Sequence, residues 1–178
     1  MIALLSLAFA GDMNPYPVTL SGGLVYHYAE GHGGTGMGRL LIHNNSGLAL
    51  DVAGGEGAAS GPGRHLGTVH IGGRYHFAHN AYVRGGFHHM HETTFDDLVA
   101  APGATLAGQG ENIVHRSGAQ VAVGGQYHWV DLIPNVAFFR RLDTGVDLSA
   151  AYMPASEGPG FYLGFEVWSS INVGRERS

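Results

Sequence analysis

The sequence predicts an all-β chain that folds as an antiparallel up-and-down transmembrane β-barrel of eight strands, with ten strands as the alternative. Apolar and polar residues alternate along most segments, which is typical of β-strands. Ionisable groups gather on one face of nearly every segment, and aromatic residues tend to end the other. The segment 67–77 shows all three features, with an apolar face and an ionisable face: Val69, Ile71, Tyr75 and Phe77, against His70, Arg74 and His76.

Nine segments alternate well enough to be candidate strands. They are 19–28, 37–43, 48–54, 67–77, 81–90, 119–129, 132–141, 146–153 and 161–171. The segment 132–141 is the weakest, because Pro134 cannot donate to a central ladder and Arg140 and Arg141 break the alternation. A closed bacterial barrel has an even number of strands, so we exclude this segment and expect eight. A further strand hidden in the segment 91–118 would give ten.

The connections fall into two kinds. Residues 44–47 and 77–80 have the composition of tight turns. The glycine-rich stretches 31–36 and 55–64 are expected to be loops. Residues 91–118 form the longest segment without alternation, and loops of this length are often functional. No segment has a convincing helical period.

Composition excludes several classes of protein. Charged residues make up 13% of the chain, about half the usual share of roughly 25%. The net charge of −5 argues against nucleic-acid binding. Cysteine is absent, so disulfides and thiolate metal sites are excluded. No run of eighteen apolar residues predicts a transmembrane helix.

The N-terminus has the features of a secretory signal. Residues 2–9 are apolar, and Ala8-Phe9-Ala10 fits the small-x-small cleavage pattern. The basic segment that normally precedes such a region is missing, so the true start is left open. We expect residues 1–10 to be a signal peptide, 11–171 the barrel and 172–178 a polar C-terminal tail.

The ionisable faces favour a membrane barrel over a soluble one. A dry protein core would leave many of these charges buried and unpaired, whereas in a narrow lumen they can pair with one another and with water. The expected luminal residues are His27, Arg39, His43, Asp51, His70, Arg74, His76, Arg84, His88, His128, Asp147 and Glu166. The expected aromatic girdle is Tyr26, Tyr28, Tyr75, Phe77, Tyr127 and Trp129. A soluble barrel of lipocalin type is the alternative, but its interior would have to be apolar.

Alternation and girdles over residues 18–171 make the chain similar to the small bacterial outer-membrane barrels, the group that includes OmpA-like, OmpX-like and OmpW-like proteins. The resemblance implies an exported protein in the outer membrane of a Gram-negative bacterium, with lipid as its partner. Such proteins commonly end on a strand with a terminal aromatic residue. Here the last predicted strand is followed by residues 172–178, which departs from that pattern.

The sequence favours a structural or surface-interaction role, with the luminal charges filling the barrel as a plug. A narrow small-solute channel, porin-like in function, is the alternative. The loop 92–118 is a candidate site for an extracellular ligand. The cluster His88-His89-Met90-His91 has alternating imidazoles, but no third ligand is fixed nearby, so we expect neither a metal nor a cofactor. The oligomeric state is left open.

One pair of residues suggests an enzyme. His115 and Ser117 lie on one face of a strand, where an imidazole can activate a hydroxyl. The pair resembles the His-x-Ser sequence of outer-membrane lipid A deacylases, which implies His115 as the base and Ser117 as the nucleophile of a lipid-modifying hydrolase. Gly118 stands where those enzymes have Asn, and the next Glu is Glu157. We therefore favour the non-enzymatic role.

Overall fold

Eight strands close into a single barrel in the computed structural model, which describes residues 14–28, 33–59, 63–107, 109, 112–154 and 160–176. The strands are β1 (Val18–Tyr28), β2 (Gly33–His43), β3 (Leu48–Ala59), β4 (Arg64–Ala78), β5 (Ala81–Thr94), β6 (Val114–His128), β7 (Leu142–Tyr152) and β8 (Phe161–Val173). Short helices lie in two of the connections: α2 (Phe95–Ala100), α3 (Pro102–Leu106), η1 (Trp129–Asp131) and η2 (Ala137–Arg141).

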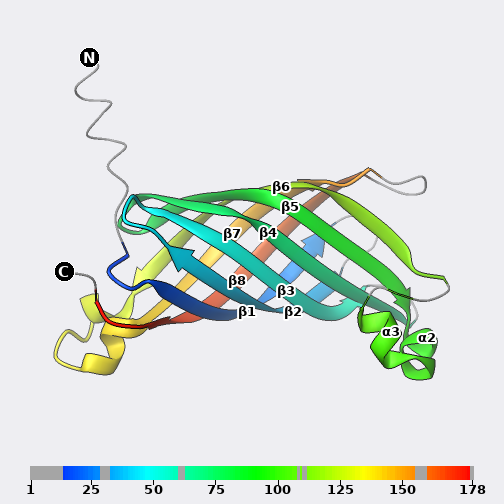
Figure 1. Ribbon diagram of the computed structural model, residues 1–178, viewed down its shortest axis with the longest axis horizontal. Coiled ribbons are helices and arrows are strands. Elements are labelled where there is room, and N and C mark those ends of the chain that lie inside the picture. Colours follow the sequence, from blue (N-terminus) through cyan, green and yellow to red (C-terminus); the bar gives the residue numbers. More distant parts are fainter. Residues whose placement is uncertain are drawn as a thin grey trace, which may run out of the picture.

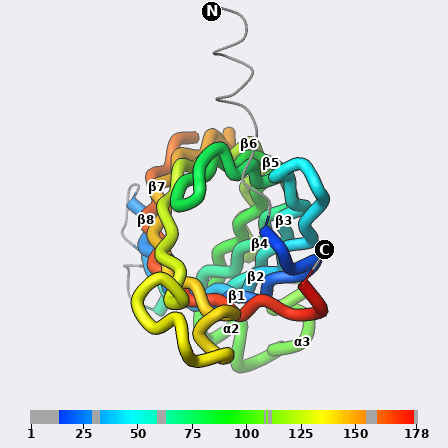
Figure 2. Tube along the Cα trace, turned by 90° about the vertical axis from the view of Figure 1, so that its left-hand side faces the viewer, coloured from blue at the N-terminus to red at the C-terminus, as the bar shows by residue number. Residues whose placement is uncertain are grey.

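Each strand pairs antiparallel with its neighbours in sequence, and β8 pairs with β1 to close the ring. Figure 1 shows the strands running obliquely along the barrel, and Figure 2 shows the closed ring in cross-section. The start of β1 and the end of β8 lie at one end, here called the terminal end, and α2 and α3 lie at the other, the loop end. The predicted fold class and strand number are confirmed.

The outward faces of the strands form an apolar belt. Leu24 and Leu148 are 73% and 61% exposed, and each of the eight strands carries exposed apolar side chains on this face, with glycine at several other outward positions. Along β8 this face runs from Phe161 to Val173, interrupted by Ser169. Twelve residue steps of about 3.4 Å, at a strand tilt of about 40°, give a height of about 30 Å, which is close to the apolar band of a membrane barrel.

The two predicted tight turns are confirmed. In the first, the Asn44 side-chain oxygen accepts hydrogen bonds from the backbone N–H groups of Ser46 (2.8 Å) and Leu48 (3.1 Å). Gly47 has a φ of 78°, which a residue with a side chain rarely adopts. In the second, His79 and Asn80 connect β4 to β5. Both turns lie at the terminal end.

The two glycine-rich loops were wrongly predicted in part. Residues 33–36 belong to β2 and residues 55–59 to β3, and these two stretches pair with each other. Glycine and alanine carry little hydrophobic signal, so alternation cannot be seen in them even where the backbone is extended. The strands at the loop end are therefore longer than the sequence pattern indicated.

The expectation that the chain has no helix was wrong for the connection between β5 and β6. The irregular segment is shorter than the predicted 91–118, because β5 continues to Thr94 and β6 begins at Val114. Thr94 caps α2 by accepting a hydrogen bond from the Asp97 N–H, and Pro102 begins α3. Helices of five and six residues are too short to show a period in the sequence.

The remaining boundaries differ in detail. The segment 132–141 forms no strand and contains η2, which agrees with its exclusion from the count. Strand β8 continues to Val173, two residues past its predicted end. The predicted signal peptide, residues 1–10, lies outside the described residues. In the described part of the chain, no helix has the length and apolar character needed to cross a membrane.

Candidate functional site

The expected luminal side chains all lie on the inward faces of the strands. All except His128 are buried: His27, Arg39, His43, Asp51, His70, Arg74, His76, Arg84, His88, Asp147 and Glu166. His128 is half-buried at the terminal end, where its Nδ1 lies 2.6 Å from an Asp143 oxygen. The structure thus places these residues on the inward faces of their strands, and the closed ring determines which of their side chains meet.

A network of ion pairs fills the middle of the lumen. Arg39 bridges two carboxylates, with its Nε 3.0 Å from Asp51 and its Nη2 2.9 Å from Glu166. Arg84 bridges Glu166 (3.2 Å) and Asp147 (2.8 Å). A third arginine, Arg74, lies 3.5 Å from Asp51. Three cations thus face three anions, which removes the net charge that would make burial prohibitive.

Two aromatic residues complete this network, and they were not among the predicted site residues. The Tyr82 hydroxyl donates to Asp147, and the Trp168 indole N–H lies 3.2 Å from the same carboxylate. The Arg74 guanidinium lies 4.1 Å from the centre of the Tyr82 ring. In the sequence, Tyr82 lies on the same strand face as Arg84, and Trp168 lies on the same face as Glu166. The alternation could therefore have identified both aromatic residues as luminal.

Glycines make room for the largest of these side chains. In register, Trp168 is paired with Gly23 on one side and Gly145 on the other. A Cβ at Gly145 would lie 2.3 Å from the Trp168 ring, and one at Gly23 would lie 2.9 Å from the Trp168 Cβ. The lumen of an eight-stranded barrel is just wide enough for side chains, so the indole occupies space that these glycines leave empty.

Further layers close the lumen on either side of the ion pairs. Towards the loop end lies an apolar layer of Leu66, Met90, Ala151, Met153 and Tyr162, all buried. Towards the terminal end lies a hydrogen-bonded layer, in which Asn172 joins Thr19 (2.5 Å), Asn14 (3.2 Å) and Asp143 (2.8 Å). Asn172 belongs to the stretch predicted as a polar tail, but it points into the barrel from β8.

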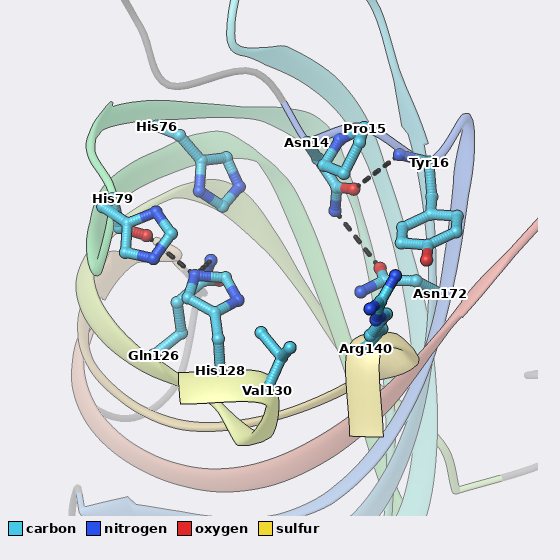
Figure 3. Close-up of a pocket in the computed structure, with 10 residues that line it drawn as sticks. All are labelled: Asn14, Pro15, Tyr16, His76, His79, Gln126, His128, Val130, Arg140 and Asn172. Atoms are coloured by element: carbon cyan, nitrogen blue, oxygen red, sulfur yellow. Dashed lines mark hydrogen bonds between the residues drawn. The ribbon is translucent and has the colours of Figure 1, made fainter. Parts of the chain in front are cut away.

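An open pocket of about 160 Å³ lies at the terminal end, outside the hydrogen-bonded layer (Figure 3). His76, His79 and His128 line one side, and Asn14, Tyr16 and Asn172 line the other. The Tyr16 hydroxyl donates to Glu176 over 2.6 Å. Burial and this carboxylate raise the pKa of Tyr16. Asn14 and Asn172, which belong to the hydrogen-bonded layer, are among the residues that line this pocket.

The predicted catalytic pair lies outside the barrel. His115 and Ser117 both point outward from β6 near the loop end. The imidazole that contacts the Ser117 hydroxyl belongs to His89 on β5, with its Nδ1 2.7 Å away. The other ring nitrogen of His89 lies 3.3 Å from His115. The three side chains thus form a row in the order Ser117, His89, His115. The imidazole next to the serine hydroxyl is that of His89 on the neighbouring strand, and not that of the predicted His115.

One group of side chains in the described residues could hold a metal ion. Glu56, His65 and His91 have potential ligand atoms within 4.8 Å of one another. They come from β3, β4 and β5 at the loop end, and their strand parity places them on the outward face. His91 belongs to the histidine cluster seen in the sequence, whereas Glu56 and His65 were not predicted as ligands.

The predicted girdle residues lie on the outward face near both ends of the barrel. Tyr26 and Tyr28 are exposed at the loop end of β1. The other four lie at the terminal end, where Trp129 packs edge-on against Tyr127 with ring centres 6.2 Å apart. Tyr75 and Phe77 occupy the corresponding end of β4. Aromatic residues thus border the apolar belt at both rims, as at the two interfaces of a membrane.

Comparison with known proteins identifies the architecture. No protein-family model and no curated protein matches the sequence. Neisserial surface protein A superposes with a TM-score of 0.62 at 10% identity, covering 91% of this chain and 99% of that one. The N-terminal β-barrel domain of Pseudomonas aeruginosa OprF gives 0.54 at 12% identity, covering 89% and 98%. The outer membrane protein OprG of the same organism gives 0.51 at 7% identity, covering 92% and 96%.

Proposed function

We propose that this small outer-membrane β-barrel is a non-conducting surface protein, in which the barrel is the membrane anchor and the loop end makes the interactions. The chain has the fold of the three solved barrels described above, and its apolar belt is the surface that lipid would cover. Export by residues 1–10 from the cytoplasm of a Gram-negative bacterium is part of this proposal.

The observation that supports it best is the plugged lumen. The side chains of Arg39, Asp51 and Asp147 are at most 1% exposed. A hydrated pore would leave these groups in contact with water. Ion pairs this deeply buried are also costly to separate, because each charge would lose its partner in a medium that solvates it poorly. The plug is therefore expected to stay closed.

The loop end offers a surface for a partner. The helical connection between β5 and β6 presents exposed apolar residues, including Val99 at 80% and Leu106 at 48%. Asp96 adds an exposed carboxylate and Asp97 a half-buried one in the first turn of α2. An exposed surface that mixes apolar and acidic groups at the rim suits a protein or surface ligand, in line with the ligand expected at residues 92–118.

Planar bilayer recordings test the plug directly. We expect the purified, folded protein to produce no stepwise conductance, because the ion pairs and the apolar layer fill the lumen. A sixteen-stranded porin added afterwards to the same bilayer serves as the positive control, since such barrels hold a water-filled channel. Reproducible conductance steps from the wild-type protein would contradict this proposal and favour the alternative function, a narrow small-solute channel.

A second candidate function, a lipid-modifying hydrolase, is favoured by the contact between Ser117 and His89. The hydroxyl and the imidazole are 2.7 Å apart on a face that lipid could reach. A serine activated by an adjacent base is the usual nucleophile of acyl-transfer enzymes. In the described part of the chain, the second ring nitrogen of His89 contacts His115, so an imidazole lies where an orienting carboxylate would be expected.

Mass spectrometry of lipid A from expressing cells tests this alternative. If the hydrolase is real, expression should remove an acyl chain, and both Ser117→Ala and His89→Ala should abolish the change by removing nucleophile and base. We expect no mass change, in agreement with the non-enzymatic role. The luminal variant Ser170→Ala is the matched control, because it deletes a hydroxyl from the opposite face of a strand.

A further inference from the structure

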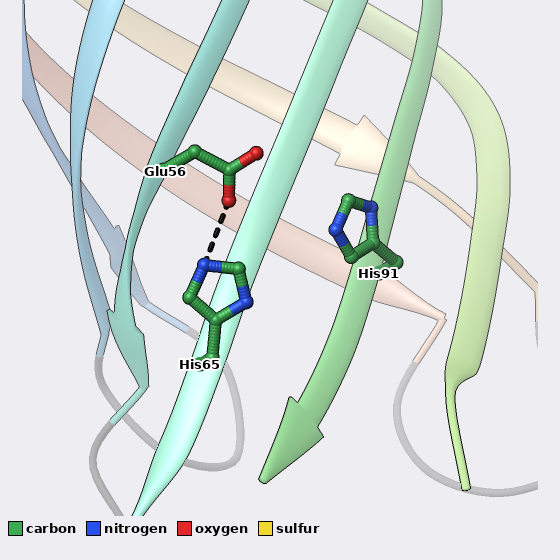
Figure 4. A group of neighbouring side chains, drawn as sticks. All are labelled: Glu56, His65 and His91. Atoms are coloured by element: carbon green, nitrogen blue, oxygen red, sulfur yellow. Dashed lines mark ion pairs between the residues drawn. The ribbon is translucent and has the colours of Figure 1, made fainter. Parts of the chain in front are cut away.

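We propose that Glu56, His65 and His91 form a binding site for one divalent transition-metal ion, of which Zn²⁺ fits the donor set best. The site lies on the outside of the barrel at the loop end (Figure 4). It is independent of the proposed function, because it shares no residue with the luminal plug and does not require a conducting or closed lumen.

Strand register brings the three side chains together. Across the sheet, Glu56 of β3 is paired with Gly67 of β4, and Gly67 is paired with His91 of β5. His65 lies two residues before Gly67 on β4 and therefore on the same face. The three potential ligands thus surround a position where the sheet carries no side chain.

Gly67 leaves the space that the site occupies. A Cβ at this position would lie 2.2 Å from the His91 imidazole and 3.0 Å from a Glu56 carboxylate oxygen. The imidazole of His91 therefore folds across the glycine towards Glu56 and His65. Any side chain at residue 67 would occupy the space in which the ligand atoms converge.

The ligand atoms are close to metal-binding distances. His65 Nε2 already lies 2.8 Å from a Glu56 oxygen, and all three groups have ligand atoms within 4.8 Å of one another. Tetrahedral ligands about 2.1 Å from a Zn²⁺ ion are separated by roughly 3.4 Å. A closure of at most about 1.4 Å by the most distant side chain, within reach of a χ rotation, would complete the geometry.

A second observation supports a ligand here: His91 Nε2 is buried and has no hydrogen-bond partner in the described part of the chain. The residue is 4% exposed, and His65 is 3% exposed. Buried polar nitrogen atoms are nearly always satisfied, so an unpartnered one directed at a carboxylate and a second imidazole calls for an explanation. A metal ion accepting this lone pair supplies one.

The donor chemistry selects the class of ion. Two imidazoles and one carboxylate suit zinc and its neighbours in the transition series, whereas Ca²⁺ and Mg²⁺ require shells of oxygen ligands. The Glu56 side chain is 46% exposed, so an ion can enter from solvent. Three protein ligands leave the fourth position of a tetrahedral ion open to water or to a donor from a partner.

Neighbouring groups complete the surroundings of the site. The Phe95 ring at the start of α2 packs edge-on against His65, with ring centres 6.0 Å apart. The His115 ring is 6.3 Å from His91 on the side away from Glu56. A bound ion would join β3, β4 and β5 at the base of the connection that carries α2.

Calorimetric titration of the untagged, folded full-length protein with ZnCl₂, after stripping with EDTA, tests the proposal. We expect one ion per chain, and no binding of Ca²⁺ under the same conditions. Zinc should also raise the thermal unfolding midpoint, because a ligand that binds only the folded state stabilises it. Absence of zinc binding by the folded wild-type protein would overturn the proposal.

Variants locate the site. His91→Ala and Glu56→Gln should each weaken zinc binding by at least about tenfold, since even outer-shell partners of metal ligands contribute that much. Gly67→Ala should also weaken it, although it removes no ligand atom. His79→Ala, at the terminal end, is the control and should bind as the wild type does.

Gel mobility before and after heating shows whether each variant is folded, and only folded protein is titrated. Two results would contradict the assignment. One is unchanged binding in folded His91→Ala. The other is binding that His115→Ala abolishes while His91→Ala keeps it, because this would place the ion on the exposed pair His89 and His115.

Discussion

Asp147→Asn is expected to lower the free energy of unfolding by about 3–5 kcal/mol, the range observed when one partner of a buried ion pair is removed. The Asp147 carboxylate forms an ion pair with Arg84. It also accepts hydrogen bonds from the Tyr82 hydroxyl and the Trp168 indole N–H. Its neutralisation leaves three buried arginines facing two carboxylates. Asparagine has nearly the same volume, so the loss measures charge and hydrogen bonding with little contribution from a cavity.

Equilibrium unfolding in urea, followed by tryptophan fluorescence in lipid vesicles, measures this change. Asp131→Asn is the matched control, because Asp131 is 46% exposed and lies 3.7 Å from His79 at the surface. An exposed pair of this kind contributes about 0–1 kcal/mol. Equal effects of the two substitutions would show that the luminal network does not stabilise the barrel.

A double substitution separates charge balance from simple loss of contacts. Arg84→Gln combined with Asp147→Asn removes one cation and one anion, so the lumen keeps two of each. Residues in one ion-pair network are coupled, and their effects do not add. The double variant should therefore lose less stability than the sum of the two single variants, with the difference reporting the interaction energy of the pair.

Alternation in the sequence predicted the faces of these residues but not their partners. Arg39 and Glu166 are 127 residues apart, and they meet because β8 closes on β1 and brings β2 within reach of β8 across the lumen. That closure depends on the register of every strand pair. Local sequence patterns report the period of a strand, whereas the pairing of luminal charges is a property of the whole ring.

The candidate metal site was missed for a related reason. The sequence placed His89 and His91 on the face opposite His88 and Met90, and this is correct. Glu56, however, lies in a stretch that its glycine content assigned to a loop, and His65 lies just before the predicted start of its strand. Only the extension of β3 and β4 beyond the alternating region brings these residues level with His91.

Leu148→Arg is expected to destabilise the membrane-inserted barrel by about 2–4 kcal/mol, the cost of an arginine facing lipid near the bilayer midplane. Leu148 points outward from the middle of β7 and is 61% exposed. Its register neighbours are Val123 on β6 and Phe165 on β8, so the new charge would find no partner on the adjoining strands. Unfolding in vesicles of defined lipid composition measures the loss.

Val173→Arg is the matched control, because it places the same side chain on the outward face at the terminal end of β8. Near the interface the cost falls to about 0–1 kcal/mol, since the guanidinium can reach the lipid headgroups and water. The difference in lost unfolding free energy between the two variants therefore reports how deep each position lies in the membrane. A water-soluble barrel would show no such dependence on position. Similar effects at both positions would mean that lipid does not cover the apolar belt, whereas a clear excess at Leu148 places the middle of β7 in the hydrocarbon layer.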